Sequence, residues 1–125
     1  MLQLELWRDS GVLVAEPDGP LGAEDFDRMA ALLDPYLEEA QRLRGLLVDT
    51  RHLPGWDGLG GMLAHERFIR AHADKLDRIA LVTDSDVGGF AALLADLALA
   101  PEVRRFAWSE RHAAMAWLTG TEPEN

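Results

Sequence analysis

The chain has 125 residues, of which 48% are hydrophobic, and it contains no cysteine. This length predicts a single domain with a sizeable core. The lack of cysteine excludes disulfides, thiol catalysis and thiolate metal sites. The formal net charge of −10 argues against a nucleic-acid partner and against docking on an anionic membrane surface.

The beginning of the sequence, Met1-Leu2-Gln3-Leu4-Glu5, lacks the basic segment and the apolar run of a signal peptide. No stretch approaches the roughly 18 consecutive apolar residues of a membrane span. We therefore expect a cytoplasmic protein with no membrane span.

The first elements form a hairpin followed by a long helix. Residues 2–7 alternate apolar and polar side chains, which is typical of a half-buried strand, and residues 12–15 form a second strand after a turn that contains Gly11. Residues 23–43 are predicted to be helical, because apolar side chains, among them Phe26, Met29 and Leu33, recur at the spacing of a core-facing helix side. Pro35 falls inside this helix and is expected to kink it or to divide it into two pieces.

The rest of the chain alternates strands with helices. Apolar runs predict strands at 46–48, 79–82 and 103–106, with helices at 59–72, 87–100 and after Ser109, which is read as a helix cap. Such alternation predicts the α/β class, with a mostly parallel sheet and the hairpin as its antiparallel edge. We expect one domain over residues 1–118 and a flexible, acidic C-terminal tail over residues 119–125.

Three places in the sequence carry a resemblance to a known family. The first is the strand end Leu47-Val48-Asp49 with Gly55-Trp56-Asp57 after it; the second is the run Ile79-Ala80-Leu81-Val82-Thr83-Asp84. The third is Glu102-Val103-Arg104-Arg105-Phe106, followed by Ala116-Trp117-Leu118. In order and spacing these resemble the SpoIIAA-like family, a branch of the STAS-type fold. The resemblance implies a sheet of four to five strands with about four helices, and no established catalytic activity.

The resemblance also implies a role in binding protein partners or small apolar ligands. Better understood relatives of this fold are bacterial anti-sigma-factor antagonists, which carry a phosphorylatable serine in an Asp-Ser-Ser-Gly-Leu-Gly context. Here Gly58, Leu59 and Gly60 match the end of that motif, and Asp57 takes the place of the serine. A serine kinase cannot phosphorylate Asp57, so this side chain either supplies a fixed negative charge or caps the following helix.

Several residues near this motif have competing interpretations. Trp56 is either a contact residue or a plug over the end of the sheet. His65 and His72 are seven residues apart on one helix, about 10 Å along its axis, which is too far for one metal ion. They are interpreted as a surface or groove pair, and no metal or other cofactor is expected. Asp49, Thr50 and His52 offer only a weak case for hydrolysis, to which Asp57 also belongs, since no nucleophile elbow is present.

Residues 87–100 predict an almost wholly apolar helix, which the protein's own helices, a second copy or a bound apolar molecule must cover. The favoured function is a non-catalytic regulatory domain that contacts a protein partner, or a second copy, through the 56–61 turn and this helix. The alternative is a carrier or sensor of a small hydrophobic ligand, and a weak hydrolase is the third possibility. The ligand cavity would be lined by Trp56, Leu59, Met62, Phe90 and Leu94.

Overall fold

The structure is a computed structural model that describes residues 2–86 and 101–120. Its strands and helices are β1 (Leu2–Trp7), β2 (Val12–Pro17), α1 (Ala23–Ala40), β3 (Leu43–Asp49), α2 (Gly58–His72), the 3-10 turn η1 (Ala73–Lys75), β4 (Leu76–Val82), β5 (Glu102–Phe106), the 3-10 turn η2 (Trp108–Glu110) and α4 (Arg111–Thr119).

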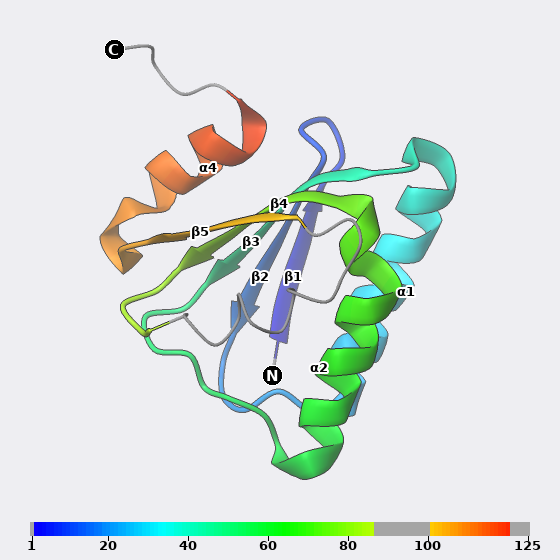
Figure 1. The fold of residues 1–125 in the computed structure, drawn as a ribbon, viewed down its shortest axis with the longest axis vertical. Helices are drawn as coiled ribbons and strands as arrows, with labels where there is room; N and C mark the ends of the chain where they lie inside the picture. The colour runs from blue at the N-terminus through cyan, green and yellow to red at the C-terminus, as the bar shows by residue number, and fades with distance from the viewer. Residues whose placement is uncertain (1, 87–100, 121–125) are drawn as a thin grey trace.

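The five strands of the described residues form one sheet in the order β1-β2-β3-β4-β5 (Figure 1). β1 and β2 pair antiparallel as a hairpin, in which Leu2 lies opposite Pro17 and Trp7 opposite Val12. The pairs β2–β3, β3–β4 and β4–β5 are all parallel. The prediction of an α/β fold with a mostly parallel sheet and an antiparallel hairpin is therefore confirmed.

The sheet separates two apolar layers. α1 and α2 cover one face and α4 covers the other (Figure 1). Successive side chains of a strand point to opposite faces, so Leu46 packs in the α1/α2 layer and its neighbour Leu47 in the α4 layer. α1 and α2 share a face because right-handed crossovers that advance in one direction across a parallel sheet place their helices on the same side.

Helix α1 differs from the sequence prediction at its end and at its proline. It stops at Ala40, because Gln41 takes a positive φ of 70° and its N–H donates to the carbonyl oxygen of Leu37. β3 then starts at Leu43, inside the range predicted to be helical. Pro35 does not divide the helix. Pro35 and Ala31 are both exposed, so water can satisfy the carbonyl that loses its N–H partner.

The last turn of the chain also differs from its prediction. Ser109 lies inside η2, and the N-cap of α4 is Glu110, so the prediction that Ser109 caps the last helix is wrong. The Glu110 side chain accepts a hydrogen bond of 2.8 Å from the N–H of Ala107 at the start of η2. α4 includes Thr119, the first residue of the predicted tail, and residues 121–125 lie outside the described residues, as does the helix predicted over 87–100. No helix in the described ranges is long and apolar enough to cross a membrane.

Candidate binding site

Two loops meet where the carboxyl end of the sheet opens beside α1 and α2. The N–H of Leu21 donates to the carbonyl oxygen of Gly55 at 3.0 Å, and the N–H of Asp57 donates to the carbonyl oxygen of Leu21 at 2.7 Å. Leu21 and Trp56 thus form an isolated parallel bridge outside the main sheet. This bridge joins the connection before α1 to the loop before α2, and it sets the position of Trp56.

Glycines allow the close approach of these two loops. Gly58 has a φ of +66°, a left-handed conformation that side chains disfavour. A Cβ on Gly61 would lie 2.3 Å from the carbonyl oxygen of Leu21 and 3.3 Å from the Cβ of Trp56. The first turn of α2 can therefore lie against the Leu21 segment only where it has no side chain.

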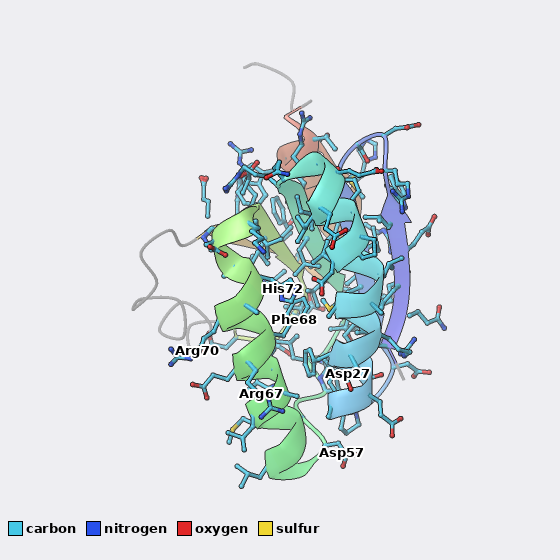
Figure 2. All side chains as sticks on the ribbon, turned by 90° about the vertical axis from the view of Figure 1, so that its right-hand side faces the viewer. Asp27, Asp57, Arg67, Phe68, Arg70 and His72 are labelled. Atoms are coloured by element: carbon cyan, nitrogen blue, oxygen red, sulfur yellow. The ribbon has the colours of Figure 1, made fainter. Side chains whose placement is uncertain are left out.

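A row of rings runs inward from Trp56, and we refer to it as the aromatic row. The ring centroids of Trp56 and His65 lie 5.3 Å apart, those of His65 and Phe26 5.4 Å, and those of Phe26 and Phe68 6.0 Å. Phe68 then stacks on His72 at 4.2 Å. Phe68 and His72 lie between α1 and α2 (Figure 2). The row joins an exposed tryptophan to the buried contact between the two helices.

His72 ends this row and ties α2 to α1. Its Nδ1 lies 2.9 Å from the carbonyl oxygen of Phe68, and its Nε2 lies 2.7 Å from Oδ1 of Asp34 on α1. His72 is buried, with 7% of its surface exposed. The interpretation of His65 and His72 as a surface or groove pair is therefore wrong for His72, which is a buried link between two helices.

A cavity of about 530 Å³ lies between the sheet and the two helices. The sheet contributes apolar side chains from β1 to β4, and α1 and α2 contribute Phe26, Met29, Phe68 and Ile69. The loop before α2 and its first turn contribute Leu53, Pro54, Trp56 and Met62. The volume and the apolar lining are typical of pockets that bind small molecules.

The residues at this end of the cavity also form an exposed apolar patch. In the described part of the chain, seven large apolar side chains are exposed, and five of them fall between residues 53 and 63. These five are called the apolar patch: Leu53, Trp56, Leu59, Met62 and Leu63. Scattered single apolar residues need no explanation, whereas a concentration of them indicates a surface that binds something.

The ionisable side chains that line the cavity, among the described residues, are His65, Glu66 and Asp86. Burial lowers the pKa of His65 below its ordinary value of 6.5, so its imidazole is neutral at pH 7. The Glu66 carboxylate pairs with the guanidinium of Arg70 one turn further along α2, at 3.1 Å. Arg70 itself points outward from α2 (Figure 2).

Two of the residues singled out from the sequence, Trp56 and Met62, line this cavity. Leu59, which was also expected to line it, is 65% exposed and lies outside the described lining. It occupies the outer side of the first turn of α2. Phe90 and Leu94 lie outside the described residues, so their predicted roles stay predictions.

Asp57 occupies the N-cap position of α2, but its side chain makes no capping hydrogen bond. Its carboxylate lies beside Gly22, 3.8 Å from the position that a Cβ on Gly22 would take. The prediction that this side chain caps the helix is therefore wrong, because the bridge to Leu21 turns it away from the free amides. Its other proposed role, a fixed negative charge, stays a prediction.

Sequence reasoning did not identify Leu21, Phe26 or His65 as parts of one site. Phe26 was expected in the core at helical spacing, and no local pattern marks Leu21. They are brought to Trp56 by the bridge between two loops that are more than 30 residues apart in the sequence. A tertiary pairing of this kind leaves no signal at either loop alone.

Comparison with known proteins agrees with the architecture. None of the curated proteins is significantly similar to the chain. The crystal structure of an uncharacterised protein of the DUF3478 family from Shewanella loihica PV-4, which has a SpoIIAA-like fold, superposes with a TM-score of 0.68. The two sequences are 23% identical, over 94% of this chain and 92% of the other. The sequence profile of the SpoIIAA-like family matches residues 12–119, and the chain therefore belongs to the SpoIIAA-like family.

Proposed function

We propose that this protein is a non-catalytic binding domain that takes up a small apolar molecule in the cavity between the sheet and helices α1 and α2. The observation that carries this proposal is the cavity of about 530 Å³, which is lined by apolar side chains and has exposed apolar residues beside it. The sequence alone favoured a protein partner, and this cavity is the reason for placing a ligand first.

The chemistry of the lining supports an apolar occupant. A water molecule in a cavity is held by two to four polar partners, and most of the described lining offers only carbon atoms. Empty apolar space also destabilises a fold, because the atoms around it lose contacts on one side. A ligand with a hydrocarbon body would replace those contacts and stabilise the folded state.

The contacts of the residues once considered for hydrolysis support a non-catalytic role. The Thr50 hydroxyl donates to the backbone carbonyl oxygen of His52 at 3.0 Å. The Asp49 carboxylate pairs with the guanidinium of Arg111. Nucleophilic catalysis needs the hydroxyl beside a base that a third group orients, and these two contacts use the hydroxyl and the carboxylate in other ways.

Ligand uptake is tested by native mass spectrometry and by melting temperature. The protein purified gently from its expressing cells should carry an added small mass that denaturation releases. Addition of dodecanol should raise the melting temperature of the stripped protein. Absence of both effects would rule out a ligand-binding role.

A variant that fills the cavity tests where the ligand binds. Val48 lines the cavity and is partly buried, so Val48→Phe adds volume there, and this variant should lose the rise in melting temperature on ligand addition. Leu63→Phe is the control, because Leu63 is 42% exposed and lies outside the described lining. An undiminished rise in Val48→Phe, with its own melting temperature unchanged, would place the ligand elsewhere.

The apolar patch supports a second candidate, a protein partner or a second copy of the chain. Trp56 and Leu59 are the kinds of exposed apolar residue that carry binding energy at interfaces. Trp56→Ala should abolish capture of the partner, or self-association in sedimentation, without lowering the melting temperature by more than a few degrees. Trp108→Ala is the matched control, because Trp108 is 46% exposed against 44% for Trp56 and lies outside the patch. An equal loss of capture or self-association in both variants would argue against the apolar patch as the contact surface.

A further inference from the structure

The described lining of the cavity contains acids and a neutral imidazole, but no lysine or arginine. Glu66 and Asp86 are the acids, and His65 is the imidazole. The charge on Glu66 is matched by Arg70, which lies on the outer side of α2. The described lining is therefore apolar over most of its area, and its polar end offers a ligand no positively charged side chain.

This arrangement discriminates among amphiphilic ligands of equal chain length. A carboxylate taken from water into the cavity would lose its hydration and gain no opposite charge, and it would lie near two other carboxylates. An uncharged head group does not carry this penalty. The neutral imidazole of His65 has one nitrogen that donates and one that accepts, so it suits a hydroxyl, ester or amide group.

We propose that the cavity selects uncharged amphiphiles, such as long-chain alcohols, esters or amides, over fatty acids. This inference rests on the proposed ligand-binding function and specifies its ligand class. His65, on the aromatic row between Trp56 and Phe26, is the residue that contacts the head group, because it is the polar side chain enclosed by rings at the cavity.

The first test compares three probes that share one chain length, at pH 7.5 and below their solubility limits and micelle concentrations. Dodecanol and methyl dodecanoate should raise the melting temperature and appear as added mass. Dodecanoate should bind at least about tenfold more weakly, because its carboxylate loses hydration in the cavity and gains no opposite charge. Tight binding of dodecanoate would overturn the inference but leave the ligand-binding function standing. Failure of all three probes to bind would overturn both.

The second test adds the missing cation. Met62 lines the cavity and is 42% exposed, so Met62→Lys places an ammonium group at its edge without burying it fully. This variant should bind dodecanoate at least about tenfold more tightly than the wild type does, with dodecanol affinity changed much less. The control is Ala71→Lys, which adds the same charge at an exposed position of the same helix, outside the described lining and outside the apolar patch, and should leave dodecanoate binding unchanged. An unchanged dodecanoate affinity in Met62→Lys would mean that charge at the cavity does not set head-group selection.

Discussion

Gly61 is the residue on which the geometry of the candidate site depends most directly. A Cβ at this position would come within 2.3 Å of the carbonyl oxygen of Leu21, and that oxygen belongs to the backbone of the bridge. The bridge cannot yield without breaking the hydrogen bond from Asp57 to Leu21. The position of Trp56 thus depends on the absence of one methyl group.

We predict that Gly61→Ala lowers the free energy of unfolding by about 1–3 kcal/mol, the usual cost of overpacking. Gly60→Ala is the control, since a Cβ on Gly60 would have no heavy atom within 4 Å. In the first turns of a helix that change should be neutral or stabilise by about 0.5–1 kcal/mol. Urea unfolding of both variants and of the wild type measures the differences in the free energy of unfolding. Similar values for the two would show that the Leu21 carbonyl moves aside easily.

At the scale of single residues, the sequence predicted part of the site. Trp56 and Met62 were identified because an aromatic among glycines and an apolar residue in the following helix turn are visible locally. The wrong prediction for Asp57 has a different cause. Whether a residue at an N-cap turns its side chain toward the helix depends on the backbone before it, and here the bridge to Leu21 sets that backbone.

Asp25 connects two elements, the edge strand β1 and helix α1. Its carboxylate accepts hydrogen bonds from the N–H of Leu2 at 3.1 Å and from the N–H of Gly22 at 2.9 Å. It also pairs with Arg28, whose guanidinium donates to the carbonyl oxygen of Leu2 at 2.6 Å. Burial opposes ionisation of Asp25, but the hydrogen bonds from Gly22, Arg28 and Leu2 together outweigh it and lower its pKa below the ordinary value of 3.8.

A lowered carboxyl pKa stabilises the folded state above the unfolded-state value of 3.8. That contribution is lost as the pH falls through the lower pKa of the folded state. We predict that Asp25→Asn is less stable than the wild type by about 1 kcal/mol at pH 7, and that this gap narrows below pH 4. Thermal unfolding at several pH values measures the gap, with Asp27→Asn, an exposed carboxylate on the same helix, as control. A stability gap that stayed constant with pH would contradict a lowered pKa of Asp25 in the folded state.

At the scale of elements, the sequence predicted the strands and their order along the chain, because buried strands are recognisable as short apolar runs. The lengths of all strands except β1 were underestimated. β3 begins at Leu43 and β4 at Leu76, three residues before the apolar runs, where alternating polar residues already pair in the sheet. The end of α1 was missed because Gln41 adopts a left-handed conformation that sequence patterns assign to glycine.

The whole molecule has two faces of different chemistry. The face with α1 and α2 holds the cavity and the aromatic row. The face with α4 holds Trp117, which is 5% exposed and lies under the guanidinium of Arg78 at 4.8 Å. Arg104 on β5 is exposed, with its guanidinium 4.8 Å from the ring centroid of Phe106. Because the sheet lies between the two faces, the described side chains that line the cavity make no direct contact with the side chains packed under α4.

The separation of Trp56 from Trp117 has an optical consequence. Indole emission depends on the polarity around the ring, and a ring at the edge of the cavity changes its surroundings when the cavity fills, whereas a ring held between an arginine and the far side of the sheet does not. Trp56 is partly in water and Trp117 is enclosed. The chain also contains Trp7 and Trp108, so a variant in which both are replaced by phenylalanine would carry Trp56 as a fluorescent reporter of the candidate site and Trp117 as an internal reference on the opposite face.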